Sequence, residues 1–143
     1  LRAALKAGLI PLVNGDVTFD DQRGGTILST EDLFIYLARE LHPRRILLAG
    51  LEKGVWADFP HRTRLIPEIT HENYPQVAAQ ISGSASIDVT GGMLEKVNSM
   101  LALGASGSQS SSASDFYAMI FSGVEAGNVK RALCGELVGT LIR

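Results

Sequence analysis

The sequence predicts an α/β fold, in which helices pack in layers against a sheet. Two observations carry this prediction. Short apolar runs of strand length alternate with apolar residues at helical spacing. In addition, residues 45–49 (RILLA) are continuously apolar from Ile46 onward, as in a parallel strand that is buried on both faces. With 143 residues, of which 45% are hydrophobic, the chain is long enough to enclose the core of one globular domain.

The first part of the chain predicts four elements. In chain order they are the last turns of a helix over residues 1–7, a buried strand over 9–14, a hairpin of 17–19 with 26–28, and a helix from 29 or 30 to about 42. Gly8 is expected to end the first helix. Ser29 or Thr30 can cap the second helix. Glu31 and Asp32, in its first turn, complement the positive end of the helix dipole.

The remainder of the chain continues the alternation of strands and helices. In chain order we expect a strand over 45–49, a polar connection through 58–62, a helix from 71 or 72 to about 80, a helix that begins at Gly91 and Gly92, a surface loop over 104–115, a strand over 117–121, a short helix over 127–134 and a strand over 138–142. The helix after the glycines is expected because apolar residues recur at helical spacing, at Met93, Val97, Met100 and Leu101.

Charge and cysteine content narrow the classes of function. Lys and Arg number 13 against 15 Asp and Glu, so no basic surface for nucleic acid is expected. No apolar stretch has the length of a membrane span and no signal-peptide pattern is present, so we expect a soluble, cytoplasmic protein without a membrane partner. The single Cys134 allows neither an internal disulfide nor a multi-cysteine metal site, and is expected to be a small buried residue. The histidines, His42, His61 and His71, lack metal-ligand spacing and are assigned to surface loops or helix ends, and no metal held by protein side chains is expected.

Residues 87–101 (IDVTGGMLEKVNSML) suggest a phosphate site. A helix N-terminus that is reached through Gly91 and Gly92 would expose backbone N–H groups and the positive end of a helix dipole to an anion. Lys96 stands one turn into the same helix and could reach that anion. The alternative is an ordinary loop that enters a helix with a solvated lysine. The segment is not a P-loop, because the Gly-x4-Gly-Lys-Ser/Thr frame is absent.

The order of four segments resembles the C-terminal half of the amino acid kinase superfamily and, within it, the isopentenyl phosphate kinases. The segments are residues 8–32, 44–60, 88–101 and 120–143. They carry a Gly-Asp-Val turn, an Ile-Leu-Ser helix start, a Gly-Val-aromatic strand exit, an Asp-Val-Thr-Gly-Gly-Met-x-x-Lys run and a C-terminal Gly-Asn followed by Gly-Thr-x-Ile. Together these segments extend over nearly the whole chain.

The resemblance implies a three-layer α/β/α sandwich with a mostly parallel sheet. Residues 1–143 would be the C-terminal, nucleotide-binding half, and an N-terminal half that binds the acceptor would precede them. The implied activity is transfer of the γ-phosphoryl group of ATP, with Mg²⁺, to isopentenyl phosphate. The alternatives are a fosfomycin kinase-like or other phosphotransferase of the superfamily, and a non-catalytic nucleotide-binding module. A homodimer is one expected assembly.

The resemblance also implies roles for individual residues. Lys96 would contact the transferring phosphoryl group, and Gly91 and Gly92 would let the backbone approach ATP. The remaining assignments are Glu31 and Asp32 for orienting the active-site lysines, Gly15 and Asp16 beside the acceptor phosphate, and Gly54, Val55, Trp56 and Pro60 in the nucleoside pocket. Each assignment has an alternative. Glu31 and Asp32 could only complement the helix dipole, and Asp16 could only form the turn. Trp56 could lie in the core or in the pocket wall.

One segment departs from the family pattern. Where relatives commonly read Thr-Asp-Val-Asp-Gly-Val-Tyr, this chain reads GLEKGVW, with Leu51 and Lys53 in place of the two aspartates. The glycine-rich loop, lysines and acceptor histidine of the family's N-terminal half have no counterpart in these residues. Since the chain also starts without methionine inside an apparent helix, we expect a longer complete polypeptide.

Overall fold

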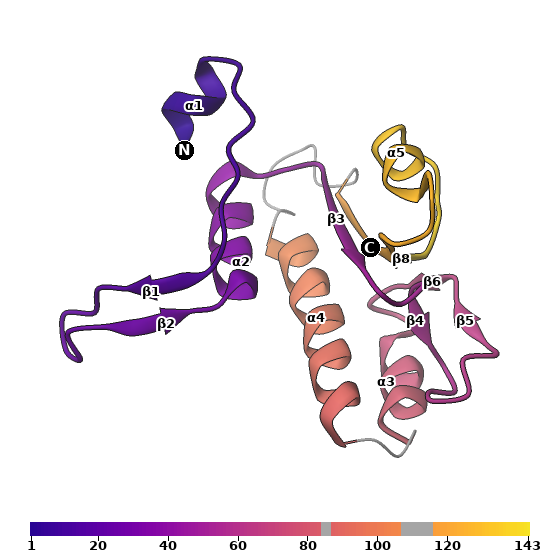
Figure 1. Ribbon diagram of the computed structural model, residues 1–143. Coiled ribbons are helices and arrows are strands. Elements are labelled where there is room, and N and C mark those ends of the chain that lie inside the picture. The colour runs from indigo at the N-terminus through magenta and orange to yellow at the C-terminus, as the bar shows by residue number, and fades with distance from the viewer. Residues whose placement is uncertain (84–86, 107–115) are drawn as a thin grey trace. The chain divides into compact units, whose positions relative to one another are not determined.

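The computed structural model describes residues 1–83, 87–106 and 116–143, and these form two compact units (Figure 1). The first unit spans Leu1–Leu41 and the second spans His42–Arg143. In the part of the chain that the structure describes, no helix is both long enough and apolar enough to cross a membrane.

The N-terminal unit contains two helices and a hairpin. Its elements are α1 (Arg2–Lys6), β1 (Asp16–Thr18), β2 (Thr26–Leu28) and α2 (Thr30–Leu41). The strands pair antiparallel with Val17 opposite Ile27, which confirms the predicted hairpin. Gly8 follows α1 with a φ of 75°, and its N–H donates to the carbonyl of Leu5 at 3.0 Å. This is the predicted end of the first helix, because glycine adopts a positive φ without steric cost.

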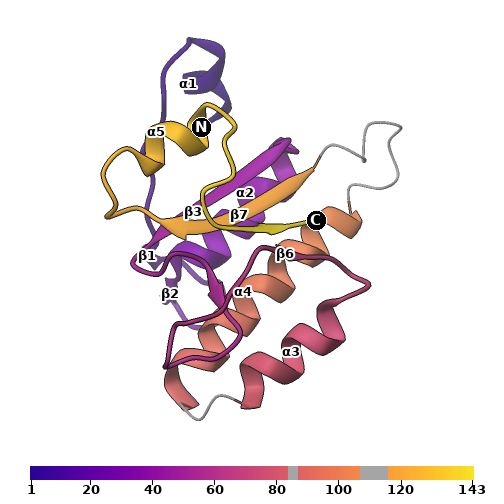
Figure 2. The ribbon, with the colours of Figure 1, turned by 90° about the vertical axis from the view of Figure 1, so that its right-hand side faces the viewer.

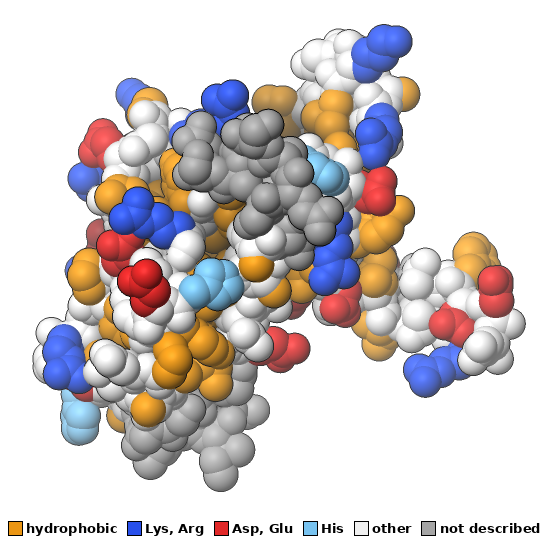
Figure 3. All heavy atoms as spheres, turned by 180° about the vertical axis from the view of Figure 1, so that it is seen from behind, with side chains coloured by type: hydrophobic (Ala, Val, Ile, Leu, Met, Phe, Trp, Pro, Cys, Tyr) orange, Lys and Arg blue, Asp and Glu red, His pale blue; other side chains and the backbone are white. Residues whose placement is uncertain are grey.

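The strand predicted over residues 9–14 is wrong. The segment carries no strand, and its apolar side chains reach solvent, with Ile10 and Leu12 96% and 99% exposed. Hydrophobic side chains (orange) are accordingly visible at the molecular surface in Figure 3. An apolar run becomes a strand only where another strand pairs with it, and none of the described residues does so here.

The second unit is built on a four-stranded mixed sheet. Its order is β3 (Arg45–Gly50), β7 (Tyr117–Ser122), β8 (Thr140–Ile142), β6 (Glu68–Ile69). The β3–β7 and β6–β8 pairs are parallel, while β7 and β8 are antiparallel. A separate antiparallel pair is formed by β4 (Val55–Trp56) and β5 (Leu65–Ile66). The mostly parallel sheet that was expected is therefore present.

Helices cover both faces of this sheet. Figure 2 shows α3 (Tyr74–Gly83) and α4 (Ile87–Ser106) on one side of the strands and α5 (Asn128–Leu133) on the other. Met119 and Phe121 of β7 form a buried cluster with Ala132 of α5. Ala118 and Ile120, which alternate with these residues along β7, are also buried and point to the opposite face, because side chains alternate along a strand. The layering confirms the predicted α/β/α architecture.

Strand β7, and not β3, is buried on both faces of the sheet. Ile46 is buried, but the last residues of β3, Ala49 and Gly50, are exposed. The reason is position, since β3 is the edge strand of the described sheet whereas β7 lies inside it. The expectation that RILLA is buried on both faces is therefore wrong in this sheet, although its pairing is parallel as expected.

Two boundaries and one buried residue also differ from the sequence prediction. Helix α4 begins at Ile87, so Gly91 and Gly92 lie in its second turn and not at its N-terminus. It continues through Ser106, where a loop from residue 104 was expected, and residues 107–115 lie outside the described part. Glycine lowers helix propensity by about 1 kcal/mol without forbidding a helix. Cys134 is exposed at the end of α5, and not buried.

One buried hydroxyl group attaches the β4–β5 pair to the sheet. Thr140 is fully buried; its hydroxyl accepts the N–H of Val55 at 2.8 Å and donates to the carbonyl of Ile66 at 2.6 Å. Gly54 allows this approach, because a Cβ there would lie 2.5 Å from the Thr140 hydroxyl oxygen. The first residue of β8 thereby fixes both short strands.

We expect Thr140→Val to lower the free energy of unfolding of the protein by about 1–3 kcal/mol. The variant keeps the side-chain shape but leaves a buried N–H and a buried carbonyl without a partner. Denaturant unfolding measures this loss. Thr140→Ser is the matched control, because it keeps the hydroxyl, and a valine variant as stable as the serine variant would contradict the prediction.

Candidate active site

The carboxyl ends of β3 and β7 form the edge at which the candidate site lies. The two strands end side by side, with Gly50 opposite Ser122, and the N–H of Gly123 donates to the carbonyl of Gly50 at 2.8 Å. Residues 51–54 and 123–127 are the loops that leave this edge. Ligands of open α/β sheets bind in the crevice beyond such carboxyl ends.

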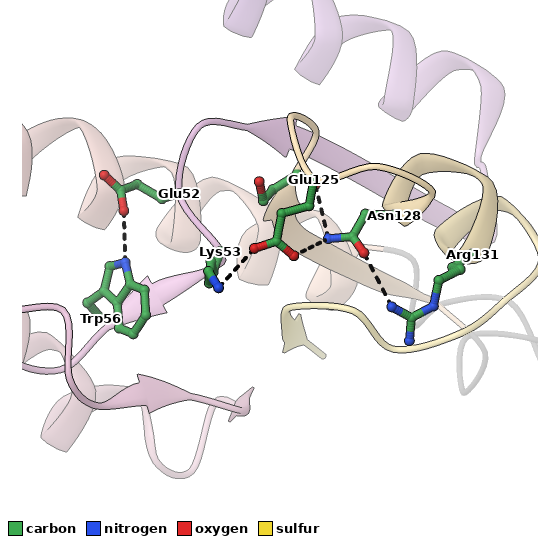
Figure 4. Close-up of polar contacts among 7 residues, drawn as sticks. Glu52, Lys53, Trp56, Glu125, Asn128 and Arg131 are labelled. Atoms are coloured by element: carbon green, nitrogen blue, oxygen red, sulfur yellow. Dashed lines mark hydrogen bonds and ion pairs between the residues drawn. The ribbon is translucent and has the colours of Figure 1, made fainter.

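An ion pair joins these two loops. Lys53 Nζ lies 2.9 Å from Glu125 Oε1, and the amide of Asn128 donates to Glu125 Oε2 at 3.1 Å (Figure 4). The charge and hydrogen bond of Lys53 hold the pKa of Glu125 below its usual range. The carboxylate therefore stays ionised and oriented at the sheet edge.

Asn128 anchors this arrangement to the body of the unit. It is buried, and its amide also donates to the carbonyl of Ser122 at 3.3 Å. The guanidinium group of Arg131 donates to Asn128 Oδ1 at 3.3 Å and to Glu136 at 2.8 Å. With both ends of its amide engaged, Asn128 has one favoured orientation.

A second set of contacts fixes the indole ring of Trp56. Glu52 accepts the indole N–H at 2.8 Å and is held by Arg62 through Nε at 3.1 Å and Nη2 at 2.9 Å. The same guanidinium group lies 4.9 Å from the centre of the Phe59 ring. Partial burial raises the pKa of Glu52, but the hydrogen bonds from Arg62 and Trp56 and the positive charge of Arg62 outweigh it and lower the pKa overall.

The four residues assigned to the nucleoside pocket differ in burial. Gly54 and Val55 are buried behind the Thr140 hydroxyl, Trp56 is half-buried, and Pro60 is exposed after a cis peptide bond. Their contact with a nucleotide stays a prediction. On this burial, Trp56 and Pro60 are accessible to a ligand, whereas Gly54 and Val55 are not.

Helix α4 carries the predicted phosphate residues. Lys96 is on its exposed side, four residues after Gly92. Since Gly91 and Gly92 lie within the helix, their N–H groups point along its axis to preceding carbonyls. A close approach to these glycines would depend on their lack of side chains rather than on free N–H groups.

The N-terminal unit brings its predicted site residues together around the start of α2. The N–H of Gly15 donates to the Thr30 hydroxyl at 3.0 Å, and a Cβ on Gly15 would lie 2.4 Å from the backbone oxygen of Leu28. Asp16 follows at once in β1 and is exposed, with one carboxylate oxygen accepting the N–H of Val17 at 2.8 Å. Glycine at position 15 is thus needed for the close packing of the turn against the helix start.

The start of α2 is capped by Ser29. The Ser29 hydroxyl accepts the N–H of Asp32 at 3.0 Å and donates to its carboxylate at 2.7 Å. Ser29 is therefore the N-cap residue, and its bond to the carboxylate gives Asp32 a role in local structure alone. Glu31 precedes it, also exposed in the first turn. A part for either acid in catalysis stays a prediction.

Titratable residues elsewhere form no metal centre in the described ranges. No group of three or more His, Cys, Asp or Glu residues there could hold a metal ion. His42, His61 and His71 are all exposed, at a helix end and in loops, as the sequence predicted.

Sequence reasoning assigned no role to several polar residues that organise the site: Glu52, Arg62, Glu125, Asn128 and Thr140. The Gly-Asn and Gly-Thr motifs contain two of them, Asn128 and Thr140, but the motifs do not show which residues these side chains contact. Thr140 and Val55 are 85 residues apart, and only the folded sheet joins them.

Comparisons with known proteins agree on one family. A family model described as "Amino acid kinase family" matches residues 1–111. The isopentenyl phosphate kinase of Methanocaldococcus jannaschii is 35% identical over 142 residues, which cover 99% of this chain and 49% of that protein. That of Haloferax volcanii is 42% identical over 102 residues, which cover 71% and 39%. The chain therefore spans about half the length, or less, of these curated relatives.

Solved structures agree with the fold. A structure described as "X-ray structures of isopentenyl phosphate kinase" superposes with a TM-score of 0.69 and 28% identity, covering 99% of this chain and 49% of that one. The N-acetylglutamate synthase of Neisseria gonorrhoeae, at 18% identity, has a TM-score of 0.65 over 99% of this chain and 29% of its own. The second likeness concerns the fold alone.

We expect Glu52→Gln to lower stability at neutral pH and to lose this effect in acid. Because the folded state depresses the Glu52 pKa, the ionised carboxylate contributes stability above its ordinary value of 4.5, and this contribution disappears as the pH falls through the depressed pKa. Denaturant unfolding from pH 7 to pH 3, followed by circular dichroism, measures the difference. Glu72→Gln, at an exposed position, controls for general charge effects. A difference between wild type and Glu52→Gln that does not change with pH would contradict the prediction.

Proposed function

The chain belongs to the amino acid kinase family, and on that premise we propose that its complete protein transfers the γ-phosphoryl group of ATP to isopentenyl phosphate, giving isopentenyl diphosphate. The observation that carries the proposal is the identity of 35% to an isopentenyl phosphate kinase over 99% of this chain. The two other curated relatives bear the same name.

In this proposal the second unit binds the nucleotide. The carboxyl edge of β3 and β7 supports it, because loops with a fixed indole ring and a lysine leave that edge. Trp56 and Pro60 would form the exposed part of the nucleoside pocket, with Gly54 and Val55 behind them. Gly91 and Gly92 would offer a helix surface without side chains near the phosphates.

Lys96 would contact the phosphoryl group during its transfer. Phosphoryl transfer spreads negative charge over the oxygens of the moving group, and catalysis depends mainly on positioning and on cations aimed at that charge. An exposed lysine on α4 can extend to such a position. Mg²⁺ would supply further positive charge; at phosphate sites it is held largely by substrate phosphates and water, with one or two carboxylates.

The N-terminal unit would serve the acceptor side. Gly15 and Asp16 would lie beside the acceptor phosphate, and Glu31 or Asp32 would orient active-site lysines. The compact junction of Gly15 with the start of α2 supports this, because it holds these residues in one local framework. The apolar slot for the alkenyl group would come from the preceding half of the complete polypeptide.

We expect the complete enzyme to phosphorylate isopentenyl phosphate in preference to fosfomycin, carbamate, glutamate or uridylate. An alkenyl phosphate needs an apolar slot with phosphate donors at one end, whereas an amino-acid acceptor needs a partner for its ammonium group. Comparison of kcat/KM over this panel, with ATP and Mg²⁺, tests the proposal. A tenfold preference for fosfomycin, about 1.4 kcal/mol in transition-state binding, would assign the protein to the fosfomycin kinase-like alternative. Absence of turnover with every acceptor would favour a non-catalytic module.

We expect Lys96→Ala in the complete enzyme to lower kcat by about 10²–10³ with little change in thermal stability. The magnitude is that of removing one group aimed at transition-state charge, while loss of an exposed helix lysine changes stability little. Steady-state kinetics and a thermal melt on the same preparation measure both. Lys6→Ala, at an exposed position of α1, is the control. Wild-type turnover of Lys96→Ala would make Lys96 an ordinary solvated lysine.

A further inference from the structure

The loop after β3 carries a cation at the edge where the nucleotide is expected. Lys53 lies in the loop that follows β3, and its ammonium group is paired with the carboxylate of Glu125. A lysine in such a loop attracts anions rather than cations or hydroxyl donors. At this position, the Lys53 ammonium group could therefore bind an anionic group of a ligand.

We propose that Lys53 is a nucleotide-binding residue whose ammonium group exchanges the carboxylate of Glu125 for a phosphate oxygen of ATP. The inference rests on the proposed function, because it assigns a residue to the same nucleotide site. Glu125 holds the ammonium group 2.9 Å away, at the carboxyl ends of two adjacent parallel strands.

The exposure of the pair makes the exchange possible. The side chain of Lys53 is 63% exposed and that of Glu125 45% exposed, so an incoming phosphate can reach the ammonium group without opening the core. Ion pairs between exposed side chains add little to stability. The four-carbon stem of lysine also lets the charge move while the backbone stays in place.

The two partners are not held equally. Glu125 is fixed from beneath by the buried amide of Asn128, which in turn bonds to the Ser122 carbonyl and to Arg131 (Figure 4). Lys53, in contrast, extends from an exposed loop residue. In an exchange, Glu125 would therefore remain in place, held by Asn128, and Lys53 would move.

The exchange predicts opposite effects for the two members of the pair. Removing the Lys53 charge takes away a phosphate contact, so nucleotide affinity falls. Removing the Glu125 charge takes away both the competitor for Lys53 and a negative charge close to the phosphates, so affinity rises. If the ion pair contributed only to folding, the two substitutions would not change nucleotide affinity in opposite directions.

The experiment measures the dissociation constants of ATP, ADP and adenosine for the complete protein by equilibrium dialysis. We expect Lys53→Met to raise the Kd of ATP and ADP by roughly tenfold, the effect of losing one charge-assisted hydrogen bond, and to leave the Kd of adenosine unchanged. Glu125→Gln should lower the Kd of ATP, and the same change made in Lys53→Met should lower it less, because only the repulsion of the phosphates is then removed. Lys6→Met, remote in sequence and exposed, is the matched control.

The possible failures are distinguishable. If wild-type protein binds no ATP, the proposed function fails and the inference fails with it. If wild-type protein binds ATP and Lys53→Met binds it equally well, or if the variant loses ATP and adenosine to the same degree, the role of Lys53 is overturned while the proposed function stands. Thermal melts of every variant show whether a changed Kd reflects altered folding.

Discussion

The parallel pairing of β3 and β7 is the interaction on which the candidate site depends. It joins Arg45–Gly50 to Tyr117–Ser122, segments that are far apart in the sequence. Both faces of β7 are buried, and Met119 and Phe121 pack against Ala132 of α5, which stabilises the register. Because the strands run in the same direction, their following loops leave the sheet at one edge. The contact between Lys53 and Glu125 is a direct result of this geometry.

A second level of order comes from buried polar groups rather than from apolar packing. The Thr140 hydroxyl binds to the backbone of both β4 and β5, and Asn128 joins the end of β7 to α5. Such groups are directional, so they specify where a loop lies in a way that apolar contacts do not. Trp56 inherits its position from β4 and its ring orientation from Glu52.

Sequence patterns predicted the elements whose signals are local. The hairpin, the capped helix α2, strand β7 and the helix after Gly127 are all confirmed, because turn residues, caps and periodicity act within a few positions. The strand expected over residues 9–14 is wrong because pairing requires a distant neighbour. The start of α4 was misplaced because two glycines weaken a helix without ending it. The predicted resemblance to the amino acid kinase family is confirmed by the match over residues 1–111.

The sequence by itself determined the family, the longer helices and strands of the second unit and which residue types stand at the candidate site. These properties follow from motifs and short-range periodicity, which can be read along the chain. Only the tertiary structure decided that Lys53 pairs with Glu125, that Glu52 holds Trp56 together with Arg62, and that Thr140 binds the backbone of β4. The two ion-paired loops and the Thr140 contact join parts of the chain that are far apart, and the Glu52 contacts depend on a loop conformation with no simple sequence signal. Such contacts arise from strand pairing and burial, which a linear pattern does not contain.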